Sequence, residues 1–226
     1  METDFKKEDF SVKSVTYDEL KEWMLYKHYA HRMPQVVYSF GLYDKNNILV
    51  GVITFGVPAS HDLIVGAVGE GWDDKFLELN RLCVNDGLPR NTLSWFVAQS
   101  LKLLPPPLII ISYADSGMNH HGYIYQATNW IYTGLSKPHT DWLPEGQEGL
   151  HCRTLYDGKF SIKTTDKKMV KVERSRKHRY FMFLGDKRIK KQMMKALRFP
   201  IVKEYPKGDN VRYDSSYKPH VQLTLF

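Results

Sequence analysis

The stretch 113–130 gathers the side chains best suited to chemistry. Asp115 follows an apolar run, residues 108–112, that is typical of a buried strand, and two histidines and a glycine come next. Tyr125 then lies in a short segment that favours a helix. Many α/β enzymes build their sites in this way, with polar groups at a strand end and in the loop after it. An ordinary strand–loop–helix connection with capping residues is the alternative.

A second group lies in the segment 27–32. His28 and His31 are three residues apart, so both can lie on one face at a helix end. With Asp115 and Tyr125, His28 would offer one nitrogen and two oxygen ligands, a mixed set that suits a first-row metal such as iron. No cysteine pair accompanies them, so the spacing is not a zinc signature. A histidine that only completes a helix end is the alternative.

The adjacent histidines His120 and His121 form a third group. Neighbouring side chains in a loop point in different directions in most conformations. One of the two is a candidate proton shuttle, because histidine titrates near neutral pH. Loop histidines without a chemical task are the other interpretation.

Residues 76–104 predict a strand, a turn-rich link that contains Gly87, and a helix. The N-terminus of a helix after such a link offers unpaired N–H groups and a positive dipole end, which together favour an anion. The side chains placed to contact that anion are Arg81, Arg90, Asn91, Thr92 and Ser94. One glycine does not make a glycine-rich phosphate loop, so an ordinary strand-to-helix connection stays open.

Charge is distributed unevenly along the 226 residues. The formal net charge is +7, but residues 1–160 carry 14 Lys and Arg against 19 Asp and Glu, a net of −5. Residues 161–226 carry 18 basic and 6 acidic side chains, a net of +12. This asymmetry favours an anionic partner. Nucleic acid fits best, because each cation that contacts the phosphate backbone releases counterions and so strengthens binding. A solvated basic surface is the alternative.

Residues 171–183 form a basic segment that also contains aromatic side chains: Lys171, Arg174, Arg176, Lys177, His178, Arg179, Tyr180, Phe181 and Phe183. Basic side chains can hold phosphates while aromatic rings stack on bases. The other interpretation is that Tyr180, Phe181 and Phe183 form a strand docked on the core, with only the charges facing outward.

A mixed sheet with helices on its faces must position these groups, which is an α+β architecture. The expected helices cover residues 17–30, 90–104, 122–129 and 189–197. The expected strands cover residues 36–43, 48–55, 76–84, 108–114, 131–135 and 150–155, the first two joined as a hairpin through the turn at 44–47. Residues 200–226 are expected to be extended.

Composition narrows the class of protein. The hydrophobic content of 42% can supply a core, and no run of 18 apolar residues could span a membrane. The segment 1–6 is acidic and lacks the apolar stretch of a secretory signal. Cys83 and Cys152 are too few and too isolated for a disulfide framework or a zinc cluster, so we expect a reducing, intracellular location.

Several of these residues also form a family pattern. They are His28-Tyr29, Leu79-Asn80-Arg81-Leu82, Ser94, Tyr113-Ala114-Asp115 and the run from Tyr125 to Trp130. The sheet order, the hairpin and the strand–helix unit at 76–104 resemble the GNAT acetyltransferase fold. Within that fold, the quoted residues resemble the Mom family of bacteriophage DNA modification proteins. The resemblance covers roughly residues 15–160 and is most specific over 113–134.

The resemblance implies a GNAT-like catalytic domain over residues 1–160, followed by a basic C-terminal extension over 161–226. It implies an enzyme that converts the N6 amino group of adenine in DNA to a carbamoylmethylated form in the host cytoplasm, which protects phage DNA from restriction. The reactive and iron-binding set would be His28, Tyr29, Asp115 and Tyr125, and Arg81 and Ser94 would contact acetyl-CoA or a related acyl donor. The segment 85–92 departs from the pyrophosphate loop of acetyltransferases.

An adenine in a duplex must be flipped out or already single-stranded before it can react. The aromatic side chains expected to hold it are Tyr29, Tyr113, Tyr123, Tyr125 and Trp130. Two other functions stay open at this point. One is an ordinary acetyl-CoA-dependent N-acetyltransferase acting on a protein or small-molecule amine, and the other is a non-enzymatic DNA-binding accessory protein.

The last five residues, Gln222-Leu223-Thr224-Leu225-Phe226, resemble the short peptide by which bacterial replication and repair proteins dock on the DNA sliding clamp. Leu223, Leu225 and Phe226 would be apolar anchors, and a few such anchors can carry most of an interface. A final strand docked on the protein's own core is the alternative.

Overall fold

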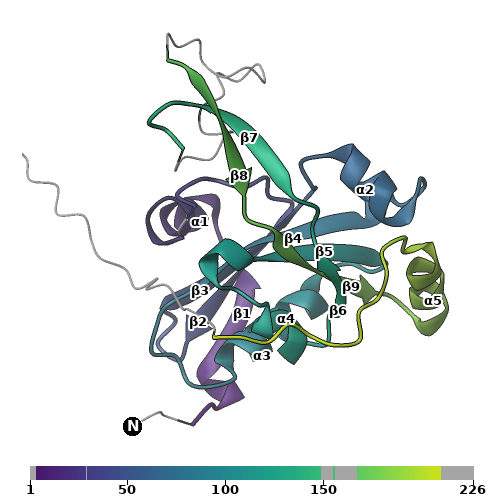
Figure 1. Cartoon of the computed structure of the whole chain (residues 1–226). Coiled ribbons are helices and arrows are strands. Elements are labelled where there is room, and N and C mark those ends of the chain that lie inside the picture. The colour runs from purple at the N-terminus through teal and green to yellow at the C-terminus, as the bar shows by residue number, and fades with distance from the viewer. Residues whose placement is uncertain (1–3, 29, 149–154, 156–166, 210–226) are drawn as a thin grey trace, which may run out of the picture.

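A computed structural model describes residues 4–28, 30–148, 155 and 167–209. Seven strands form a mixed sheet in the order β1-β2-β3-β4-β5-β9-β6, and β7 and β8 form a separate ribbon (Figure 1). The strands are β1 Phe10–Ser14, β2 Tyr38–Asp44, β3 Leu49–Gly56, β4 Phe76–Val84, β5 Leu108–Asp115, β6 Ile131–Leu135, β7 His139–Pro144, β8 Met169–Arg174 and β9 Lys177–Leu184.

The α-helices are α1 Tyr17–Glu22, α2 His61–Val68, α3 Thr92–Leu103, α4 Tyr123–Ala127 and α5 Lys187–Ala196. A π-helical turn, Trp23–Lys27, continues α1, and short 3₁₀ turns cover Lys7–Asp9, Asp73–Lys75 and Ser116–Met118. Side chains from α3 and α4 pack with one face of the sheet, whereas α2 and α5 share a cluster on the other face. α1 packs on Val52 and Cys83. The predicted α+β fold, a mixed sheet flanked by helices, is confirmed.

The parallel pair β4 and β5 separates halfway along its length. The two strands pair only from Phe76 with Ile109 to Glu78 with Ile111, and both continue beyond that point. β4 also carries a β-bulge at Asn80, because Thr54 of β3 lies opposite Arg81 and Phe55 lies opposite Leu79. A bulge bends its strand and redirects the side chains beside it. The separation and the bulge together open a gap in the middle of the sheet.

Strand β9 lies between β5 and β6, in the interior of the sheet. It pairs antiparallel with β5 from Leu108 opposite Leu184 to Asp115 opposite Lys177. We expected residues from 161 on to form an appended basic extension, but this part of the segment is a sheet strand. Its aromatic side chains explain the difference, since Tyr180 and Phe181 are completely buried. The boundary at residue 160 stays a prediction for the rest of the segment.

Other expectations differ in detail. The helix expected over 17–30 ends at Lys27, so His28 has an extended backbone beyond it. The hairpin is confirmed, with Asp44 accepting backbone hydrogen bonds from Asn46 and Ile48 in its turn. The predicted strand 150–155 lies outside the described residues except for Leu155, which is in no strand. None of the expected ranges covers β1, α2, β7 or β8.

Residues 197–209 form a strap across the edge strand β6 and the helix α4, drawn in yellow-green to yellow in Figure 1. The Val202 backbone N–H donates to the Tyr132 carbonyl over 2.9 Å, and the Tyr205 hydroxyl donates to the Trp130 carbonyl over 2.7 Å. The Tyr123 hydroxyl donates to the Gly208 carbonyl over 2.7 Å. Within the described residues, none of the helices has the length and apolar character needed to cross a membrane.

Candidate functional site

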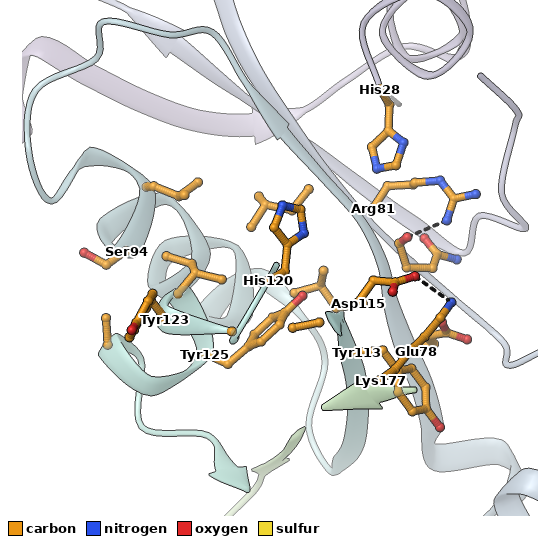
Figure 2. Close-up of a pocket in the computed structure, with 18 of the residues that line it drawn as sticks. His28, Glu78, Arg81, Ser94, Tyr113, Asp115, His120, Tyr123, Tyr125 and Lys177 are labelled. Atoms are coloured by element: carbon orange, nitrogen blue, oxygen red, sulfur yellow. Dashed lines mark hydrogen bonds and ion pairs between the residues drawn. The ribbon is translucent and has the colours of Figure 1, made fainter. Parts of the chain in front are cut away.

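A cavity of about 500 Å³ occupies the gap between β4 and β5 (Figure 2). Its volume lies in the range of small-molecule sites. The polar and aromatic side chains that line it are His28, Glu78, Asn80, Arg81, Asn91, Ser94, Tyr113, Asp115, His120, Tyr123, Tyr125 and Lys177. The cavity therefore brings together groups from five separate parts of the chain, including His28, Asp115 and Tyr125 of the predicted reactive set.

Asp115 ends β5 at the edge of the cavity and is held by three groups. Its Oδ1 accepts hydrogen bonds from the Gly117 backbone N–H over 2.9 Å and from Ser175 Oγ over 2.5 Å. Its Oδ2 lies 3.8 Å from Lys177 Nζ (Figure 2), and 20% of its side chain is exposed. The carboxylate is thus fixed in orientation while one oxygen still faces a cation and the cavity.

Tyr125 reaches the cavity from α4, and Ser112 of β5 holds its hydroxyl. Ser112 Oγ lies 2.7 Å from the Tyr125 hydroxyl and donates to the Leu79 carbonyl of β4 over 2.8 Å. A hydroxyl has one proton, so Tyr125 acts as the donor to Ser112 when Ser112 donates to Leu79. Ser112 therefore ties together β4, β5 and α4 at the point where the two strands separate.

His28 is 4% exposed and faces the cavity above Arg81 (Figure 2). Its Nδ1 accepts a hydrogen bond from the Ala30 backbone N–H over 3.1 Å, which assigns the proton of the neutral ring to Nε2. Burial, together with the nearby charge of Arg81, lowers the pKa of His28 to about 3. The ring is therefore neutral at physiological pH and serves as an N–H donor rather than a base.

Arg81 and Tyr113 supply further polar groups. The Arg81 Nη1 donates to the Asn80 carbonyl over 2.6 Å, inside the bulge that directs this side chain to the cavity. Burial raises the pKa of the Tyr113 hydroxyl well above its usual value, the Glu78 carboxylate adds to the rise, and the Arg179 guanidinium opposes it. Tyr113 is thus a neutral phenol that can donate a hydrogen bond.

The N-terminal turn of α3 borders the cavity opposite His28. Asn91 and Ser94 line the cavity, and the Asn91 side chain makes no capping hydrogen bond to α3. Two members of the expected anion set lie elsewhere, because Thr92 is completely buried and Arg90 is an exposed residue outside the lining. The first turn of α3 can still receive an anion at its positive dipole end.

Other expected groups are not brought to the cavity. Tyr29 lies outside the described residues. His31 is not in the lining, and its Nδ1 lies 2.8 Å from the Leu25 carbonyl. His121 is not in the lining either and packs beside His178. Trp130 is buried in the core. The proposed stacking of bases on Tyr180, Phe181 and Phe183 is wrong, because the core buries all three rings.

Sequence reasoning missed four groups of this site: Glu78, Ser112, Ser175 and Lys177. Ser112 reads as part of an apolar strand and carries no signal of its own. Lys177 and Ser175 come 60 residues or more after Asp115, and only the pairing of β5 with β9 brings them close. An alternating pattern of polar and apolar residues in β9 would have been a usable signal, but residues 180–184 are apolar or aromatic on both faces of the strand.

Two comparisons concern sequence. The model of the Mom protein family matches residues 9–207. The methylcarbamoylase Mom of Escherichia phage Mu is 26% identical over 200 residues, which cover 80% of this chain and 77% of that protein.

Solved acetyltransferases are similar in structure at 8–9% identity. The ribosomal-protein-S5-alanine acetyltransferase from Vibrio fischeri matches with a TM-score of 0.47, covering 81% of this chain and 98% of that chain. The spermidine N-acetyltransferase from Vibrio cholerae, in complex with CoA and spermine, matches with a TM-score of 0.43, covering 77% and 95%. These similarities are weak, whereas the family model spans the cavity and nearly all described residues: the chain belongs to the Mom protein family.

Proposed function

We propose that this protein is a transferase that modifies the N6 amino group of adenine in DNA, attaching a carbamoylmethyl group. Membership in the Mom family and the similarity to a methylcarbamoylase support the activity. The observation that supports a location for the reaction is the cavity between β4 and β5, which His28, Asp115 and Tyr125 all line. Modification of this kind would protect phage DNA from restriction in the host cytoplasm.

The donor would enter from the α3 side of the cavity. An acyl-CoA-type donor carries phosphates, and the first turn of α3 with Asn91 and Ser94 offers a positive dipole end to receive them. Arg81 adds a cation within the same cavity. The reactive end of the donor would then lie near the point where β4 and β5 separate.

The adenine would lie between Asp115 and the aromatic side chains Tyr113, Tyr123 and Tyr125, all of which line the cavity. The base has to leave its stack to reach them. As N6 forms its bond to the methylene carbon of the carbamoylmethyl group, the bond from that carbon to the leaving group of the donor breaks, and the leaving group departs with the electron pair. The N6 nitrogen loses a proton, and the Asp115 carboxylate is the group positioned to accept it. The Nε2–H of His28 would hydrogen-bond a developing negative charge on the donor.

Iron is a further expectation of the family resemblance. Among the described residues, no group of three His, Cys, Asp or Glu side chains gathers as a metal site. The three proposed ligands are also engaged, since His28 Nδ1 and Asp115 Oδ1 accept hydrogen bonds and the Tyr125 hydroxyl contacts Ser112. As they are arranged, these groups do not fit an iron ion.

The test is a nucleoside analysis of DNA from cells that express the protein. We expect deoxyadenosine with the added mass of a carbamoylmethyl group, and about 100-fold less of this product, or lower still, with the Asp115→Asn variant. Lys102→Gln, an exposed change on the last turn of α3, is the matched control and should modify DNA as the parent does. Unmodified DNA with acetylated amines would identify an ordinary acetyltransferase. Salt-sensitive DNA binding without any product would identify an accessory protein.

The C-terminal peptide supplies a second proposal, that residues 222–226 dock on the bacterial sliding clamp. They lie outside the described residues. The last described residues, Gly208 and Asp209, lie beside Tyr123 of the cavity. A tether from that point would raise the local concentration of DNA near the site. A synthetic peptide of residues 217–226 should bind the clamp with micromolar affinity, and Phe226→Ala should abolish binding. Absence of binding by the full-length protein in calorimetry would exclude the partner.

A further inference from the structure

Helix α5 has a strongly basic outer face. Its ten residues contain five cations and no acidic residue, and all five cations are exposed: Lys187, Arg188, Lys190, Lys191 and Lys195. Asp186 caps the helix, with its Oδ1 accepting the Ile189 backbone N–H over 2.8 Å. Asp186 is the one acidic residue in the sequence between Glu173 and Glu204, so the exposed cations of α5 produce a concentrated positive field.

The opposite face of α5 is fixed to the core. Met193 is completely buried and belongs to the same cluster as Phe181 and Phe183 of β9, with Ile189 and Ala196 packed against it. The apolar side of the helix is thus occupied by the protein itself. Basic amphipathic helices bind membranes by inserting an apolar face. The apolar face of α5 is covered by the core, and Met194 is the one large hydrophobic side chain of this helix that is exposed. The helix lies at the periphery of the fold (Figure 1).

None of these five cations forms an ion pair within the described part of the chain. Five unpaired like charges on three helical turns repel one another, which disfavours the helix. The repulsion disappears when a polyanion lies along the face. This arrangement is typical of a surface that contacts phosphates, and Lys187, Lys191 and Lys195 recur every four residues along it.

We infer that α5 contacts the phosphate backbone of duplex DNA, which rests on the proposed function in that DNA is the substrate. Helical residues four apart rise about 6 Å, so Lys187 to Lys195 span about 12 Å. One strand of B-DNA carries a phosphate about every 3.4 Å of axis, so the row extends along three to four phosphates. Contacts of this kind position the protein without reading sequence.

The surface lies at a useful distance from the cavity. α5 packs on Phe183, which pairs with Ile109 near the start of β5, whereas Asp115 ends the same strand. Six strand residues extend about 20 Å. That length corresponds to about six base pairs of duplex. A duplex held by α5 therefore reaches the cavity about half a helical turn away from the contact.

The test compares two triple variants of the full-length protein. One is Lys187→Gln/Lys191→Gln/Lys195→Gln, and the other is Lys7→Gln/Lys45→Gln/Lys102→Gln, which removes the same charge from exposed positions off the helix. Affinity for a fluorescent 20-base-pair duplex is measured by anisotropy from 50 to 300 mM salt. The slope of log affinity against log salt is negative, and each lost phosphate contact reduces its magnitude by about 0.9. The magnitude of the slope for the α5 variant should therefore be about 2 to 3 smaller than for the parent. The control variant should keep it within about 0.5.

Equal slopes for the two variants would overturn the inference. Loss of binding to vesicles of anionic lipid, with DNA binding intact, would overturn it too and assign α5 to a membrane. The deoxyadenosine product measured in cells separates this inference from the proposed function. Normal product with equal slopes refutes only the α5 contact, whereas absent product in the parent with a lowered α5 slope refutes only the adenine chemistry. Circular dichroism confirms that both variants are folded.

Discussion

Replacing Ser112 with alanine should weaken both the fold and the site. The hydroxyl is completely buried and lies 2.8 Å from the Leu79 carbonyl and 2.7 Å from the Tyr125 hydroxyl. Each buried hydrogen bond contributes about 1 kcal/mol net, and a carbonyl left unsatisfied adds to the loss. The variant should therefore lose about 2 kcal/mol of unfolding free energy, which lowers the Tm of a chain of this size by about 4–8 °C.

Ser100→Ala is the matched control. Ser100 is equally buried, in α3, but its Oγ has no hydrogen-bond partner among the described residues. Removing that hydroxyl relieves a buried unsatisfied group, so this variant should be neutral or slightly more stable. Urea unfolding of both variants, with the m-value as a check on two-state behaviour, measures the difference.

A double-mutant cycle with Tyr125→Phe isolates the contact between the two hydroxyls. Residues in direct contact show coupling of about 0.5 kcal/mol or more, and we expect that for Ser112 and Tyr125. Adenine modification should fall with Ser112→Ala, because the Tyr125 ring loses the group that orients it. The reasoning is refuted if Ser112→Ala and Ser100→Ala have the same stability, or if the cycle is additive within error.

Three further predictions concern other residues of the site. Asp115→Asn keeps the shape of the side chain but removes the charge, so adenine modification should fall about 100-fold or more with unchanged Tm, and near-parental product would remove this carboxylate from the chemistry. His28 has a pKa of about 3 in the folded protein and about 6.5 in the unfolded chain, so the free energy of unfolding falls as the pH falls through that window, by about 2–3 kcal/mol at pH 4.5. Urea unfolding at pH 7 and pH 4.5 should show a smaller loss of stability for the His28→Gln variant than for the parent. An equal loss in the two proteins would contradict the assignment. Gly122→Ala places a Cβ 2.5 Å from the Tyr180 ring at a φ of +78°, whereas Gly87→Ala adds a Cβ at a φ of +76° with no atom within 4 Å. The Gly122 variant should therefore lose more stability than the Gly87 variant. Equal Tm values would show that the Tyr180 ring moves freely.

Much of the fold follows from local patterns. β4 and β6 have the predicted bounds, since each combines turn residues at both ends with apolar or β-branched side chains. The order of the strands in the sheet does not follow from local patterns. Residues 180–184 of β9 are apolar or aromatic on both faces, and no periodicity assigns this strand to the place between β5 and β6. The helix over 17–30 was predicted too long because a π-turn widens it after Glu22, and the chain leaves the helix at His28.

The site divides in the same way. Asp115 and the first turn of α3 follow from a strand end and a helix start, which are local signals. His28 and Tyr125 share the cavity with Asp115, a juxtaposition that the family resemblance implied and that no spacing rule could give. The positions of Lys177 and Ser175 beside Asp115 depend on strand pairing across about 60 residues of sequence. No local pattern near Asp115 could therefore predict them.

The interior position of β9 also constrains how the protein is made. On a ribosome, β1 to β6 emerge first, yet β6 has no partner in the sheet until β9 arrives, because it pairs with β9 alone. The edge of β5 stays open for the same interval. Unpaired strand edges in a nascent chain invite pairing with other chains. Any truncated chain that ends before residue 184 lacks Lys177 or the complete strand β9. We expect such a chain to aggregate rather than to accumulate as a partly active enzyme.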